Sequence, residues 1–110
     1  MINTIKEQNG YLIVDLNISE ASLNNSDPFK RELIALLDEK QKKVVIDMSK
    51  VEYMDSSFLG ALVSSLKHAI ALKSDIVLIG LRKDISDLFA LIRLDKVFKI
   101  YKDFNEVPTT

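Results

Sequence analysis

Three short runs of apolar, mostly β-branched residues alternate with longer segments of helical periodicity, and this alternation restricts the possible folds more than any other feature. The runs are YLIVDL at 11–16, KVVIDM at 43–48 and DIVLIG at 75–80. Nearly continuous apolar strands are typical of sheets that are covered on both faces, as parallel sheets usually are. The pattern therefore predicts an α/β fold whose central strands are parallel.

An amino-terminal hairpin is expected to extend this sheet. INTIKEQ at 2–8 predicts a modest edge strand, and Asn9-Gly10 is a strong two-residue turn signal leading into the first apolar run. KVFKI at 96–100 predicts a last short strand. We therefore expect a single domain over residues 1–110, with a mixed sheet of four to five strands and about four helices.

Three segments predict the main helices. Ser26-Asp27-Pro28 supplies a cap and a first-turn proline for the first helix. The second is predicted from about Ser57 to Leu72 and the third over KDISDLFALIRL, and DFNEVPTT holds one further helical turn. The side chains expected to point inward are Leu59, Leu62, Val63, Leu66, Ala69 and Ile70 in the second helix and Ile85, Leu88, Phe89 and Ile92 in the third.

Charge and composition exclude several classes of function. Fifteen basic and sixteen acidic residues give a net charge of -1, so no electrostatic feature points to nucleic acid or to an anionic membrane. The chain has no cysteine, which excludes disulfides, thiolate metal sites and cysteine catalysis. Its amino terminus has no signal-peptide pattern, and no apolar run approaches the length needed to span a membrane. We expect a cytoplasmic protein.

The stretch MDSSFLG at 54–60 places two serines between a predicted strand and a predicted helix. In open α/β sheets, functional sites commonly lie at the carboxyl ends of the strands. Asp55, Ser56 or Ser57 can cap the helix by accepting from the free amides of its first turn, which contributes about 1 kcal/mol. Capping needs only one such residue, so the second hydroxyl is surplus to it, with or without a role of its own.

Catalysis by these serines is not supported by the sequence. A nucleophile elbow has the pattern G-x-S-x-G, whereas Asp55 precedes Ser56 and Phe58 lies two positions after it. The single histidine, His68, lies about three turns further along the same predicted helix and is expected to be an ordinary exposed residue. No set of spaced metal ligands and no glycine-rich phosphate loop is present. The sequence therefore predicts neither an enzyme nor a cofactor.

The remaining interpretation is that a serine is itself modified. A phosphoryl group on a hydroxyl at a helix amino terminus adds a charge of about -1.5 to -2, which the amide dipoles favour. Asp55 beside it repels that charge. The protein would tolerate the phosphate and stay folded. In a complex docked on this face, however, the new charge would be buried without a compensating charge, which costs several kcal/mol of binding free energy.

The segments KVVIDMSKVEYMDSSFLGALVSSLKHA and SDIVLIGLRKDISDLFALIRLDKVFKIY resemble the STAS domain of bacterial anti-sigma factor antagonists, with its D-S-S/T-G-L-G motif. The resemblance implies that Ser56 is phosphorylated by a partner anti-sigma factor serine kinase. It also implies that the unmodified form binds this kinase, that phosphorylation releases it, and that a PP2C-type phosphatase resets the switch. Asp55, Ser57 and Gly60 would support the site. The alternative is a STAS module that binds or scaffolds in a signalling or transport assembly without being phosphorylated.

The sequence departs from the resembled family at three places. Phe58 replaces the usual glycine after the serine pair, the acidic turn after the second strand is reduced to Glu20, and Arg93 replaces a frequent glycine in a local turn. We expect Phe58 to be solvent-accessible and to contact the partner, although it can instead fold back onto the sheet. The predicted partner-binding residues are Met54, Phe58, Ala61 and Ser65, with Leu72 on the same partly exposed face.

Overall fold

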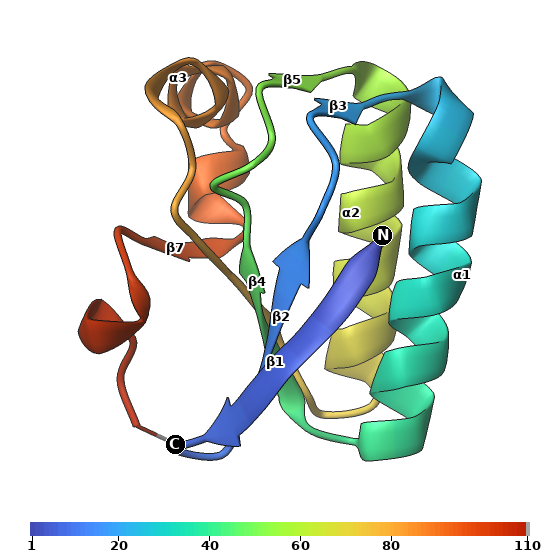
Figure 1. Ribbon diagram of the computed structural model, residues 1–110, viewed down its shortest axis with the longest axis vertical. Helices are drawn as coiled ribbons and strands as arrows, with labels where there is room; N and C mark the ends of the chain where they lie inside the picture. The colour runs from blue at the N-terminus through green and yellow to red at the C-terminus, as the bar shows by residue number, and fades with distance from the viewer. Residues whose placement is uncertain (110) are drawn as a thin grey trace.

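A five-stranded mixed sheet forms the centre of the computed structural model, which describes residues 1–109 (Figure 1). The strand order is β1-β2-β4-β6-β7, in which β1 is antiparallel to β2 and the other neighbouring pairs are parallel. The predicted fold class is confirmed, including the hairpin and the parallel centre. The strands are β1 Ile2–Gln8, β2 Tyr11–Leu16, β4 Lys43–Asp47, β6 Ile76–Ile79 and β7 Lys99–Tyr101.

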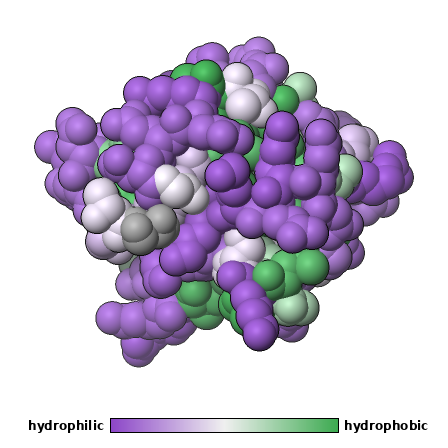
Figure 2. Space-filling view, turned by 90° about the horizontal axis from the view of Figure 1, so that it is seen from below, coloured by the Kyte–Doolittle hydropathy of each residue, from purple (hydrophilic) through white to green (hydrophobic). Residues whose placement is uncertain are grey.

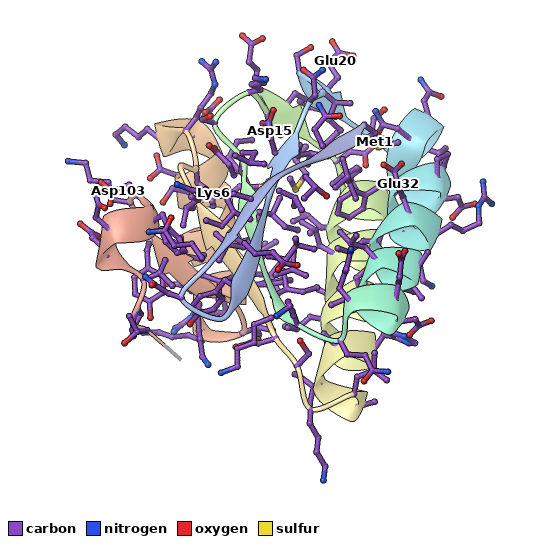
Figure 3. All side chains as sticks on the ribbon, turned by 60° about the horizontal axis from the view of Figure 1, so that its bottom comes forward. Met1, Lys6, Asp15, Glu20, Glu32 and Asp103 are labelled. Atoms are coloured by element: carbon purple, nitrogen blue, oxygen red, sulfur yellow. The ribbon has the colours of Figure 1, made fainter. Side chains whose placement is uncertain are left out.

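The hairpin between β1 and β2 turns where the sequence predicts. Asn9 and Gly10 both have positive φ angles, 55° and 86°, as a two-residue turn matched to the twist of the strands requires. The register shifts between Thr4 and Lys6, so Ile5 lies in a bulge of this edge strand. The start of β1 is held against the first helix, since the Ile2 amide donates to Glu32 Oε1 at 3.0 Å (Figure 3).

The first helix begins earlier than predicted. Helix α1 spans Leu23–Lys40 and is capped by Ser22, whose Oγ accepts from the Asn24 amide while Asn25 Oδ1 accepts from the Ser22 amide at 2.8 Å. This reciprocal arrangement is a capping box in which asparagine replaces the usual glutamate or glutamine. Pro28 therefore lies inside the helix rather than in its first turn, and Ser26 is buried instead of serving as the cap.

Helices α1 and α2 cover one face of the sheet, and α3 adds to the same core (Figure 1). Helix α2 spans Ser56–Ala71 and α3 spans Lys83–Leu91, with short 3-10 turns at Leu94–Lys96 and Phe104–Glu106. Most of the predicted inward side chains are buried. Val63 and Leu88 are partly buried, and Ile70 and Ile92, each at the end of its helix, are exposed.

Arg93 joins α3 to the following 3-10 turn in a left-handed backbone conformation, with a φ of 65°. Glycine adopts this conformation at no steric cost, which accounts for the frequent glycine of the resembled family. Arg93 adopts the same conformation here, so the departure is confined to a local turn, as expected. Lys96, the first residue of the predicted last strand, belongs to this 3-10 turn instead. Strand β7 consequently begins at Lys99, three residues later than predicted.

The second face of the sheet is covered by the carboxyl-terminal segment. Tyr11, Ile13, Val45, Val77 and Ile79 form a smaller core with Val107, and Tyr101 and Phe104 pack against it. The ring of Tyr11 meets that of Phe104 edge-on at 6.1 Å, and its hydroxyl donates to the Pro108 carbonyl oxygen at 2.9 Å. Burial raises the pKa of Tyr11. Both faces of the central strands are thus covered, which explains their continuous apolar sequences.

Removing the Tyr11 hydroxyl should loosen this carboxyl-terminal segment. Tyr11→Phe keeps the ring contact but leaves the Pro108 carbonyl without its donor, so we expect the free energy of unfolding to fall by about 0.5–1.5 kcal/mol. Urea unfolding measures the change. Tyr53→Phe, at an exposed tyrosine, is the matched control and should change stability little. Equal stabilities of wild type and Tyr11→Phe would show that the hydrogen bond does not hold the segment.

Candidate functional site

A second, two-stranded sheet lies at the carboxyl ends of the parallel strands (Figure 1). Its strands, β3 (Glu20–Ala21) and β5 (Tyr53–Met54), pair in parallel with Glu20 beside Tyr53 and Ala21 beside Met54. Glu20 and Tyr53 are exposed, whereas Ala21 and Met54 are buried. Sequence patterns did not reveal this sheet, because a two-residue strand has no periodicity. It brings the connection before α1 next to the connection before α2.

Asp55 caps both helices that begin at this end of the molecule. Its Oδ1 accepts from the Phe58 amide in the first turn of α2 at 3.0 Å, and its Oδ2 accepts from the Leu23 amide at the start of α1 at 2.9 Å. Its own amide donates to the Ala21 carbonyl oxygen at 2.9 Å. From the sequence, Asp55, Ser56 or Ser57 could each cap α2, and the structure selects Asp55. The hydrogen bond from the Leu23 amide of α1 was not predicted. One carboxylate therefore fixes two helix starts relative to each other.

Ser56 is the first residue of α2 and is exposed. Ser57, directly after it, is half-buried. Gly60 lies one helical turn beyond Ser56, is exposed, and has open space around the position of a Cβ atom. Of the two hydroxyls, the one at Ser56 is thus the more accessible to another protein, and the surface beside it is not obstructed at Gly60. The supporting roles of Asp55, Ser57 and Gly60 stay predictions.

The expectation that Phe58 is accessible is wrong. Its side chain is completely buried, and its ring lies 4.4 Å from that of Phe29 in α1, with an angle of 34° between the ring planes. Helix α1 covers the face of α2 on which Phe58 lies, a contact between helices that the periodicity of one helix does not reveal. Phe58 belongs to the core, where its ring fills space that a glycine would leave open.

The other predicted partner-binding residues are also inaccessible. Met54, Ala61 and Ser65 are buried, and the Ser65 hydroxyl donates to the Ala61 carbonyl oxygen at 2.8 Å. Leu72 alone of that predicted face is exposed, at the far end of α2. Binding of a partner through Met54, Phe58, Ala61 and Ser65 stays a prediction, and in this structure these residues expose almost no surface.

His68 has a structural partner far from the serines. Its Nε2 lies 2.7 Å from Asp38 Oδ1, which links α2 to α1, and its side chain is partly shielded rather than freely exposed as expected.

Within residues 1–109, no group of three or more histidine, cysteine or acidic residues is arranged to hold a metal ion. In the same part of the chain, every helix is too short or too polar to cross a membrane.

Comparison with known proteins identifies the family. The STAS domain profile matches residues 4–107. A protein of Thermotoga neapolitana, provisionally named an anti-sigma factor antagonist and TM1081 homolog, is 26% identical over 88 residues, covering 79% of this chain and 78% of that protein. The crystal structure of TM1081 from Thermotoga maritima, also a provisionally named antagonist, has a TM-score of 0.82 at 23% identity, covering 96% of this chain and 89% of that one.

A more distant neighbour is the Bacillus anti-sigma factor antagonist SpoIIAA, solved in unphosphorylated and phosphorylated forms. Its TM-scores are 0.70 and 0.67 at 10% and 11% identity, covering 96% of this chain and 92% and 95% of those chains. At such low identity the likeness concerns the fold. Because the family profile spans nearly the whole chain, the protein belongs to the STAS domain family, and several anti-sigma factor antagonists are similar to it.

Proposed function

We propose that this protein is a phosphorylation-switched anti-sigma factor antagonist that acts in the cytoplasm as one domain over residues 1–110. Unphosphorylated, it sequesters an anti-sigma factor serine kinase. Phosphorylation of Ser56 by that kinase releases the complex, and a PP2C-type phosphatase restores the binding form. The observation that carries the proposal is the exposed hydroxyl of Ser56 at the first position of α2, beside a capping carboxylate.

The surroundings of Ser56 support a switch that changes binding without unfolding the domain. A phosphoryl group there lies at the positive end of the α2 dipole, which favours its charge. The Phe58 amide already donates to the Asp55 carboxylate, so the phosphate can form fewer hydrogen bonds to the amides of the first turn. The carboxylate also repels the phosphate. Most of the new charge is therefore left facing outward, where a docked partner would have to desolvate it.

The experiment uses variants of Ser56 with purified anti-sigma factor kinases from the source organism. Incubation with ATP and the cognate kinase should add one phosphate to the wild type, as intact-mass spectrometry would show, and none to Ser56→Ala. Ser56→Ala should still form the complex. Ser57→Ala is the matched control, because it removes the adjacent hydroxyl and should still gain the phosphate. Phosphate mapped to Ser57, or retained in Ser56→Ala, would contradict the assignment.

Ser56→Asp tests whether charge is the signal. It places about one negative charge in the first turn of α2, where the helix dipole favours it, so its stability should stay near that of the wild type. Affinity for the kinase should fall at least tenfold, about 1.4 kcal/mol. Raising the salt concentration should recover little of the loss, since a charge desolvated in an interface is poorly screened. Equal affinities of Ser56→Asp and Ser56→Ala would favour a scaffold that is not switched by phosphorylation.

A further inference from the structure

The end of the molecule opposite Ser56 carries the carboxyl ends of α1 and α2 (Figure 1). The connections that follow the two helices lead into β4 and β6. They lie side by side, because the Val44 amide donates to the Asp75 carbonyl oxygen at 3.0 Å. Ile70, near the end of α2, is about 20 Å along the helix axis from Ser56 at 1.5 Å per residue. This surface is therefore separate from the one around Ser56.

Positive charge is in excess at this end, in the last turns of the two helices and the connections after them, residues 37–43 and 67–75. Two of the three acidic side chains there have partners, since Asp75 pairs with Lys99 at 2.8 Å and Asp38 lies against His68. Within residues 1–109, no salt bridge involves the lysines of this region, which are Lys40, Lys42, Lys43, Lys67 and Lys73. Their charges are thus available to a negatively charged partner.

Lys73 occupies a backbone position that usually holds glycine. The Ser74 amide donates to the Ala69 carbonyl oxygen at 2.8 Å. The Lys73 amide donates to the Ile70 carbonyl oxygen at 2.9 Å, and the two bonds together form the Schellman arrangement that ends a helix. Lys73 has a left-handed φ of 59°, which glycine adopts more easily than any other residue. Backbone conformation alone favours glycine here, so the lysine adds its charge at a position where it lowers stability.

Two apolar side chains are exposed among these lysines. Ile70 is 59% exposed and Leu72 is 40% exposed. Lys67 lies one turn before Ile70 and so on the same face of α2. Figure 2 shows this end of the molecule from below as largely hydrophilic, with the apolar residues in small separate areas. An apolar side chain within a positive surface fits a partner segment that carries an apolar residue among acidic ones.

The chemistry of this surface favours an acidic protein segment over a phosphate-rich partner. The lysines are accompanied by no arginine at 37–43 or 67–75, whereas sites that recognise phosphate commonly use arginine. No phenylalanine, tyrosine or tryptophan occurs in these two segments, so no such ring is offered for bases to stack on. Ile70 and Leu72 are too few to form the apolar face of a membrane-embedded helix.

We infer that the carboxyl ends of α1 and α2, with the connections after them, form a second docking surface, which binds an acidic segment of a partner protein. Carboxylates of the segment pair with Lys40, Lys67 and Lys73, and an apolar side chain of the segment packs on Ile70. This inference does not rest on the proposed function. Because charges in solution are screened over about 8–10 Å, the state of Ser56 does not alter binding at this distance.

Fluorescence anisotropy tests the surface with a labelled synthetic peptide of about 12 residues, glutamate and aspartate around a central pair of leucines, which as a helix spans about 18 Å. Lys73→Gly should weaken binding about threefold, the size expected for one exposed ion pair. Its melting temperature should stay level or rise, because glycine relieves the left-handed backbone. Weaker binding by a variant of equal or higher stability cannot come from unfolding.

Charge reversal provides the larger effect. Lys40→Glu combined with Lys67→Glu should weaken binding of the peptide at least tenfold. Lys96→Glu is the matched control, since Lys96 is exposed and lies outside this end of the molecule, and it should leave the affinity unchanged. If the peptide does not bind the wild type, or if Lys96→Glu weakens binding as much as the double reversal, the inference is overturned.

The apolar contact and the kind of partner are tested separately. Ile70→Ala should weaken binding about threefold, whereas Leu91→Ala, at an 80% exposed leucine that ends α3, should not. Ser56→Asp should bind the peptide like the wild type, whatever its affinity for a kinase. Vesicles of phosphatidylcholine with and without phosphatidylserine provide the alternative partner. Binding of the phosphatidylserine vesicles but not of the peptide, lost in the double reversal, would make this a membrane surface and overturn the inference.

Discussion

Phe58→Ala should lower the free energy of unfolding by about 3–5 kcal/mol, the range found when buried aromatic side chains are truncated. The ring is completely buried and stacks on Phe29, so its removal leaves a cavity between α1 and α2 and also removes an aromatic pair. Phe58→Gly, which restores the glycine of the resembled motif, should cost still more, because glycine also weakens the helix.

Chemical denaturation of Phe58→Ala beside Ile70→Ala measures this effect. Ile70 is an exposed apolar residue of the same helix, so its truncation should change stability by less than about 0.5 kcal/mol. The folded fraction of Phe58→Ala should bind the kinase nearly as well as the wild type. A loss of stability below about 1 kcal/mol, combined with a large loss of affinity, would mean that the ring is a contact residue in solution.

Asp55→Ala should have the second largest effect, a loss of about 2–4 kcal/mol. An N-cap side chain contributes about 0.5–2 kcal/mol and a hydrogen bond to a charged group about 1.5–3 kcal/mol, and the two bonds of this carboxylate are not fully additive. Both the Phe58 and the Leu23 amides would lose their acceptor. The substitution therefore destabilises the starts of α1 and α2 at the same time.

Asp55→Asn separates the two bonds. Its single carbonyl oxygen can accept from one of the two amides, so the loss should lie between those of wild type and Asp55→Ala. Ser22→Ala, which removes a cap from α1 alone, is the control and should cost about 1 kcal/mol. Thermal unfolding followed by circular dichroism gives the order. If Asp55→Ala costs no more than Ser22→Ala, the carboxylate does not link the two helices in solution.

Much of the fold could be predicted because its signals are local. The runs at 11–16, 43–48 and 75–80 are nearly continuous apolar sequences, and Asn9-Gly10 specifies its turn through two positive φ angles. The start of α1 was misplaced because Ser26-Asp27-Pro28 is a stronger local signal than Ser22 with Asn25. The capping box that determines the start uses an asparagine in an uncommon role.

The candidate site was predictable only in part, for a related reason. The place of Ser56 and Asp55 follows from where one strand ends and one helix begins, which the sequence shows directly. The burial of Phe58 depends on where α1 crosses α2, and the bond from Asp55 to Leu23 depends on β3 lying beside β5. Such contacts between distant segments leave no periodic trace in either segment.

The double cap at Asp55 also has a consequence for the order in which the chain folds. The bond from Leu23 to Asp55 joins residues 32 positions apart, whereas the β1·β2 hairpin closes through a two-residue turn. Closing a long loop costs entropy before its contacts are gained, so the hairpin should form early and the end of the molecule that carries Ser56 late. In the native state the Leu23 and Phe58 amides should exchange hydrogen with solvent through a common opening, since one carboxylate protects both.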